Sequence, residues 1–141
     1  YGYMPKLTFS TDGVSLEIFP YTFEKWGTEI TPLIGEQKEK MMEYLQKLSR
    51  LFQDPAEHEA YFKGWCMIAG PVYAEMMVFR QKYLEEEKWS EDRDFLNLRN
   101  LYTCEAHNEL MTSLLMMIEN KELAFGKEMA EKVKELQKMP F

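Results

Sequence analysis

The residues best suited to chemistry are Cys104, Glu105 and His107, which lie within four positions of one another in a chain of 141 residues. On a helix, Cys104 and His107 are three residues apart and share a face, so they supply half of a possible zinc site. A structural zinc ion needs four ligands, and the whole sequence contains only two cysteines and two histidines. We therefore expect no metal and no cofactor here.

The same segment has two other interpretations. Apolar residues surround Glu105 and His107 at helical spacing, and buried polar groups must be paired. We expect both side chains to be mostly buried, with Arg80 or Arg99 as the charged partner. The group forms either a buried polar network that joins two helices or the lining of a ligand pocket. Its candidate members are Arg80, Arg99, Asn100, Cys104, Glu105 and His107.

The chain carries no motif of a self-contained enzyme. A Gly-rich phosphate loop, a Gly-x-Ser-x-Gly nucleophile elbow and a His-Glu-x-x-His metal motif are all absent from it. We therefore expect no catalytic residue and no enzyme activity from this chain alone. The net charge of -7 argues against nucleic acid as a partner, because binding phosphates needs a basic face. The longest charge-free apolar run, Gly64–Ala74, is too short to span a membrane.

Residues 1–34 predict a β-hairpin. Leu7 and Phe9 alternate with polar residues in one run, and a second run, Val14–Phe19, alternates in the same way. Asp12-Gly13 between the runs is typical of a tight turn. The expected hairpin spans about Lys6 to Phe19. Two strands alone are marginally stable in water, so the hairpin needs a helix beneath it or further strands beside it.

Residues 35–141 predict a bundle of four to five helices. Apolar residues recur at helical spacing throughout this region, and Asp54 followed by Pro55 is a strong helix start. The fold class is therefore mainly α with a small β-hairpin (α+β), with residues 1–34 as a hairpin segment and 35–141 as a helical domain. The expected helices cover Glu36–Gln53, a segment from Asp54 that Gly70-Pro71 breaks or kinks, Tyr73–Leu84, Ser90–Glu119 and Leu123–Lys138.

A series of short motifs extends over most of the chain. They are Leu7-Thr8-Phe9, Asp12-Gly13, Leu16-Glu17-Ile18-Phe19-Pro20, Pro32-Leu33-Ile34-Gly35-Glu36, Leu48-Ser49 and the stretch Arg99–His107. In this order they resemble the C-terminal part of CapA-like capsule or poly-γ-glutamate biosynthesis proteins. That family has a calcineurin-like metallophosphatase fold, and some longer members carry a helical extension with a stretch similar to Arg99–His107.

The resemblance implies that the chain is a C-terminal portion of a larger bacterial protein. Residues 1–34 are then the last strands of an upstream domain, and that domain is the partner of the helical region. The metal-ligand motifs of the family lie in its earlier part and match no position here, so no catalytic or metal-binding residue is carried over. The resemblance thus implies a non-catalytic structural or assembly role, in the cell envelope or outside the cytoplasm.

Two functions therefore remain open from the sequence. The chain is either this non-catalytic portion of a CapA-like protein or a free-standing helical module that binds a small ligand or a partner between its helices. On the first interpretation, the hairpin has an exposed strand edge. Unpaired edge groups favour further pairing, so we expect self-association through the hairpin edge or a helix that covers it.

Overall fold

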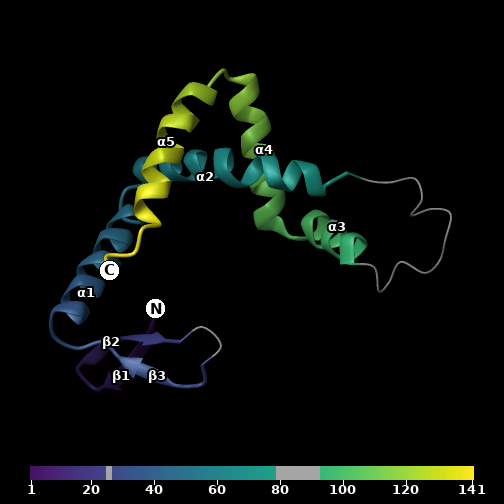
Figure 1. Ribbon diagram of the computed structural model, residues 1–141. Coiled ribbons are helices and arrows are strands. Elements are labelled where there is room, and N and C mark those ends of the chain that lie inside the picture. Colours follow the sequence, from purple (N-terminus) through teal and green to yellow (C-terminus); the bar gives the residue numbers. More distant parts are fainter. Residues whose placement is uncertain (25–26, 79–92) are drawn as a thin grey trace. The chain divides into compact units, whose positions relative to one another are not determined.

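The computed structural model describes residues 1–24, 27–78 and 93–141, which form two compact units (Figure 1). Unit 1 comprises Tyr1–Leu51 together with Met139–Phe141, and unit 2 comprises Phe52–Lys138. The sequence places a domain boundary between residues 34 and 35, where the strands end and the helices begin. In the structure, the first helix instead packs in the same unit as the strands.

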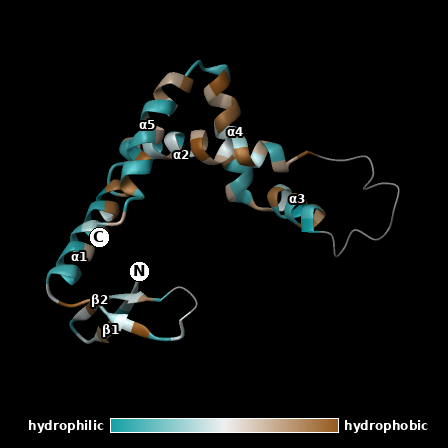
Figure 2. Ribbon diagram, viewed as in Figure 1, coloured by the Kyte–Doolittle hydropathy of each residue, from teal (hydrophilic) through white to brown (hydrophobic). Residues whose placement is uncertain are grey.

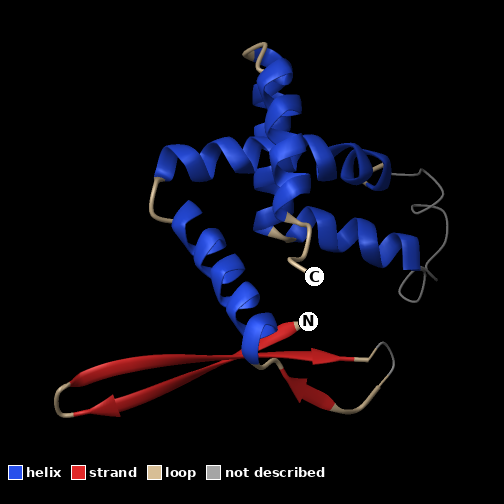
Figure 3. Ribbon diagram, turned by 60° about the vertical axis from the view of Figure 1, so that its left-hand side comes forward, coloured by secondary structure: helices blue, strands red, loops and turns tan. Residues whose placement is uncertain are grey.

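Unit 1 contains a three-stranded antiparallel sheet in the order β1-β2-β3 (Figure 3). The predicted hairpin is confirmed, and its strands β1 (Gly2–Ser10) and β2 (Gly13–Phe23) extend beyond the expected limits. Gly13 closes the turn with a φ of 135°, a backbone conformation that residues other than glycine rarely adopt. A short third strand, β3 (Ile30–Pro32), pairs with the end of β2.

Helix α1 (Gly35–Leu51) completes unit 1. The chain enters it through Gly35, whose φ is 52°. The core of this unit is small: among the described residues, its buried apolar side chains are Pro20, Leu33 and Met41. The backbone N–H of Leu33 also donates to the carbonyl of Pro20 at 2.9 Å, which ties the segment before α1 to β2.

Unit 2 is helical in its described part. Its helices are α2 (Pro55–Met76), α3 (Arg93–Thr103), α4 (Glu105–Glu119) and α5 (Leu123–Leu136). With α1, they confirm the predicted helical fold class. Hydrophobic residues gather along α2 and α4 (Figure 2), where Cys66, Ala69, Leu110 and Met117 form a buried cluster. Among the described residues, no helix is long and apolar enough to cross a membrane.

Helix α2 differs from the expectation at its proline. The predicted start is confirmed: the Asp54 carboxylate accepts hydrogen bonds from the N–H groups of Ala56 (2.9 Å) and Glu57 (3.3 Å). The helix then continues through Pro71 to Met76, so Gly70-Pro71 does not break it. The buried contacts of α2 outweigh the one backbone hydrogen bond that proline removes. The second half of the next expected helix, Tyr73–Leu84, lies outside the described residues.

The prediction of one long helix over Ser90–Glu119 is wrong. The described part of this segment is divided at Cys104, which has extended backbone angles (φ −89°, ψ 118°) and forms the N-cap of α4. Polar side chains bind the carbonyls at this break: the Thr103 hydroxyl donates to Arg99 at 2.9 Å, and the Asn108 amide donates to Tyr102 at 2.9 Å. These bonds satisfy backbone groups that would otherwise continue the helix.

Candidate functional site

The residues singled out from the sequence do not form a buried polar network in the described structure. Glu105 is exposed, and so are Arg99 and Asn100, while Arg80 lies outside the described residues. The expectation that Glu105 is buried is wrong. Because the chain breaks at Cys104, Glu105 opens α4 and lies in its first turn, where a carboxylate interacts favourably with the helix dipole and with water.

His107 is the member of this group with an unusual environment. Its ring is partly buried and meets the ring of Tyr73 edge-on, with centroids 4.9 Å apart and planes at 74°. Its Nδ1 atom is buried and has no hydrogen-bond partner among the described residues. Cys104 is also partly buried but no longer shares a helix with His107. In the described part of the chain, no three His, Cys, Asp or Glu side chains are grouped to hold a metal ion.

A second polar group lies at the side of unit 2, where Lys63 of α2 faces the start of α5. Its Nζ atom is 2.9 Å from a carboxylate oxygen of Glu122 and 3.4 Å from one of Glu59. The hydrogen bond that Lys63 donates to Glu122 raises the pKa of Lys63. A pocket of about 280 Å³ adjoins this group. The lysine charge is already balanced by two carboxylates, so the cluster links helices rather than offering a cation to a ligand.

Near the turn, the two faces of the β1–β2 hairpin differ in polarity. One face carries the ion pair between Lys6 and Glu17, with Nζ 2.9 Å from Oε2, and places Thr8 opposite Ser15; farther from the turn it also carries the apolar pair Met4–Phe19. On the other face, four successive cross-strand pairs are entirely apolar. This apolar face consists of Tyr3 opposite Pro20, Pro5 opposite Ile18, Leu7 opposite Leu16 and Phe9 opposite Val14. An antiparallel sheet of this kind normally packs its apolar side against another layer.

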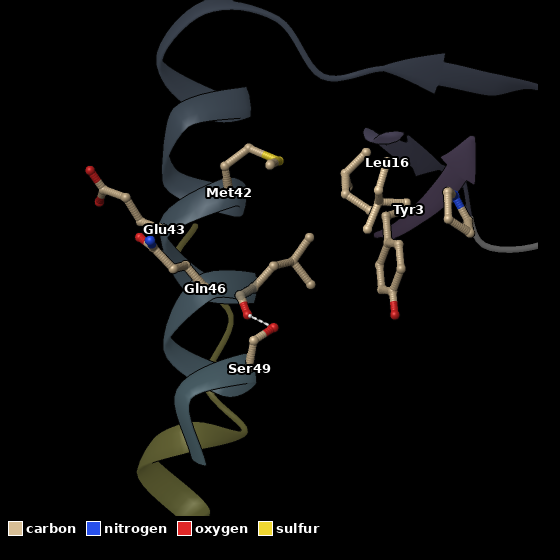
Figure 4. Close-up of a pocket in the computed structure, with 9 residues that line it drawn as sticks. Tyr3, Leu16, Met42, Glu43, Gln46 and Ser49 are labelled. Atoms are coloured by element: carbon tan, nitrogen blue, oxygen red, sulfur yellow. Dashed lines mark hydrogen bonds between the residues drawn. The ribbon is translucent and has the colours of Figure 1, made fainter. Parts of the chain in front are cut away.

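Helix α1 covers only part of the apolar face. A pocket of about 670 Å³ separates the two layers, lined from the sheet by Tyr3, Leu16 and their neighbours and from α1 by Met42 and Leu45. Met42 points across this pocket toward the hairpin, whereas Glu43, which also lines the pocket, points its carboxylate away from the hairpin (Figure 4). The end of the hairpin near its turn projects beyond α1 (Figure 3).

The side chains at that end are exposed although they are large and apolar. We call them the hairpin tip: Leu7 (56% exposed), Phe9 (74%), Val14 (61%) and Leu16 (59%). Isolated exposed apolar residues are common on proteins, but two adjacent cross-strand pairs form a continuous patch. The alternation of Leu7 and Phe9 with polar residues could have indicated the apolar face from the sequence. Nothing in the sequence indicates that the tip stays uncovered.

No family model, curated protein or solved structure gives a significant match to this chain.

Proposed function

We propose that the chain is a non-catalytic assembly module that binds another folded domain through its N-terminal sheet. The observation that carries the proposal is the hairpin tip, where two adjacent pairs, Leu7–Leu16 and Phe9–Val14, are more than half exposed. Continuous apolar patches of this kind on soluble proteins mark interaction sites, because exposing them to water is unfavourable.

The resemblance to CapA-like proteins suggests which domain this is. We propose that the chain is the C-terminal portion of such a protein and that its partner is the upstream metallophosphatase-fold domain. Catalysis would then belong to the upstream domain. The present chain would have a structural or assembly role in capsule or poly-γ-glutamate biosynthesis at the bacterial cell envelope.

Sequencing the reading frame upstream of Tyr1 tests the family, and a binding experiment tests the assembly role. If the frame encodes a metallophosphatase-fold domain, that domain is produced separately and added to the isotope-labelled chain in an NMR titration. We expect shifts in amide signals of residues 2–20 and none in the core of unit 2. A frame without such a domain overturns the CapA-like proposal. A titration without shifts overturns the assembly role.

A free-standing module that binds a small apolar ligand is the second candidate. The pocket between the hairpin and α1 favours it, because its 670 Å³ is within the range of about 300–1,000 Å³ that is usual for ligand sites. It lies between a sheet and a helix, not between helices as the sequence suggested. Titration with a neutral fluorescent dye such as Nile red tests it: we expect saturable binding that Leu45→Asp abolishes and that Lys47→Ala, an exposed position of α1 outside the pocket lining, leaves unchanged.

A further inference from the structure

We infer that the upstream domain docks an apolar surface onto the hairpin tip, and that it does not add a strand to the edge of the sheet. This inference rests on the proposed function, since it specifies how the proposed partner is held. The occupant is an apolar patch on a domain of the same polypeptide.

Both edges of the three-stranded sheet are poorly suited to strand addition. The outer strand β1 contains Pro5, which has no N–H to donate, followed by Lys6, whose charge disfavours a neighbouring strand. The opposite edge strand, β3, has only three residues and ends in Pro32. Short edge strands, prolines and lysines are the features by which proteins prevent edge pairing. Self-association through the hairpin edge, expected from the sequence, is therefore the less favourable mode.

Near the turn, only one face of the hairpin suits an apolar partner. The face with Lys6 and Glu17 pairs its charges internally, so a partner there would have to desolvate both groups. The hairpin tip, by contrast, presents only carbon atoms from its side chains. Covering Phe9 and Leu16 removes apolar surface from water without leaving a polar side chain unpaired.

The size of the hairpin tip favours a tethered partner over a second copy of the chain. From the exposed fractions of its four side chains, the tip offers on the order of 400 Å², about half of the 800 Å² that each partner contributes to a standard stable interface. Two free copies that met through this patch alone would therefore associate weakly. A domain in the same polypeptide is held at a high effective concentration, so a contact of this size suffices.

Side-chain footprinting with hydroxyl radicals tests the inference. The full-length polypeptide and the present chain are oxidised under the same conditions, and modification is read residue by residue. We expect oxidation of Phe9 and Leu16 to fall at least about fivefold in the full-length protein, because a docked surface excludes water from the interface core. Met4 and Phe19, paired on the opposite face and 47% and 43% exposed, are internal controls that should not change.

The possible outcomes separate the inference from the proposed function. If no residue of the chain is protected in the full-length protein, both are overturned. If Met4 and Phe19 are protected while Phe9 is not, the proposed function stands and the docking surface is wrong. If Phe9 is already protected in the present chain, increasingly so at higher concentration, the occupant is a second copy and the inference is overturned.

A pair of variants provides an independent measurement. Phe9→Ser replaces the most exposed residue of the tip, and Phe19→Ser is its matched control on the other face. In the NMR titration, we expect Phe9→Ser to raise the Kd for the upstream domain at least about tenfold, as for an aromatic anchor, and Phe19→Ser to change it less than about twofold. Equal effects of the two variants would overturn the inference. Unchanged hairpin amide signals in the free variant would exclude misfolding as the cause.

Discussion

The two units differ in how much of their apolar surface they bury themselves. Among the described residues, thirteen apolar side chains are buried; Pro20, Leu33 and Met41 are in unit 1, and the other ten are in unit 2. Yet unit 1 has the more regular apolar pattern, with four apolar cross-strand pairs on one face of its hairpin. The difference indicates that unit 2 holds itself together, whereas unit 1 has an apolar face that its own residues do not fill.

Removing a core side chain from unit 2 should have the largest effect. Met117 is 1% exposed and packs in the cluster between α2 and α4. Met117→Ala should lower the free energy of unfolding by about 3 kcal/mol, through lost burial and the cavity left behind. Its neighbour Met116 is 54% exposed, so Met116→Ala should cost less than about 0.5 kcal/mol. Thermal unfolding followed by circular dichroism measures both, and equal losses would contradict a core centred on Met117.

A smaller loss is expected where α2 and α5 approach most closely. A Cβ atom added at Gly64 would lie 2.6 Å from the backbone carbonyl of Met129, which cannot rotate away. Gly64→Ala should therefore cost about 2 kcal/mol despite the better helix propensity of alanine. At Gly70 the added atom meets the end of the flexible Leu114 side chain instead. Gly70→Ala should thus lower the free energy of unfolding clearly less than Gly64→Ala. Chemical denaturation measures both, and a larger loss for Gly70→Ala would contradict the close contact between α2 and α5 at Gly64.

Unit 1 should respond to its own contacts without affecting unit 2. The rings of Tyr1 and Phe141 stack with centroids 4.4 Å apart, which brings the last residue of the chain into this unit. Phe141→Ala should destabilise unit 1 by about 1 kcal/mol, as for other aromatic pairs, while Phe141→Tyr preserves the stack. Hydrogen exchange of β1 amides should accelerate in the alanine variant only. Equal acceleration in α5 would show that the two units unfold together.

The sequence was sufficient for the elements that depend on local pattern. Alternation and the Asp12-Gly13 turn predicted the hairpin, and Asp54-Pro55 predicted the start of α2. It was insufficient where nonlocal contacts decide. The three residues of β3 are too few to show a period, and they become a strand only because β2 lies beside them. The break at Cys104 depends on side chains that bind carbonyls across it, which the apolar stripe through this segment conceals.

The candidate site shows the same division between local pattern and tertiary context. Which residues share the apolar face follows from the alternation of Leu7 and Phe9. Whether another layer covers these residues depends on where α1 packs against the sheet, and the sequence of the hairpin does not determine that position. At the polar residues near His107, the local pattern gave the wrong prediction. Their helical spacing predicted burial, but Glu105 begins a new helix and faces solvent.

The exposed position of Glu105 predicts a small effect on unit 2. Glu105→Gln removes a carboxylate from the first turn of α4 and should cost about 0.5 kcal/mol, the usual size of a helix-dipole interaction. A buried ion pair would instead cost about 3–5 kcal/mol when one partner is removed. The melting curve of the variant distinguishes the two. A loss in the larger range would contradict the exposed position of this side chain.

The smallest effect concerns an ion pair on α1, on the solvent side of unit 1. Lys40 Nζ lies 2.8 Å from Glu36 Oε1, one helical turn away. The hydrogen bond from Lys40, and then its charge, lowers the pKa of Glu36, and the same contact raises the pKa of Lys40. A carboxyl whose pKa is lowered by folding stabilises the folded state above its unfolded pKa, and this contribution is lost as pH falls through the folded value.

For Lys40 the sign is opposite. A lysine whose pKa is raised by folding stabilises the folded state below its unfolded pKa, and that contribution is lost as pH rises through the folded value. The pair therefore supports α1 between the ordinary pKa values of glutamate and lysine side chains. Both groups are exposed to water, so a change in melting temperature is not the suitable readout. The suitable readout is a carbon-detected NMR titration of the Glu36 carboxyl. We expect Glu36 to titrate at lower pH in the parent chain than in Lys40→Met. Superimposable titration curves would show that the pair does not form in solution.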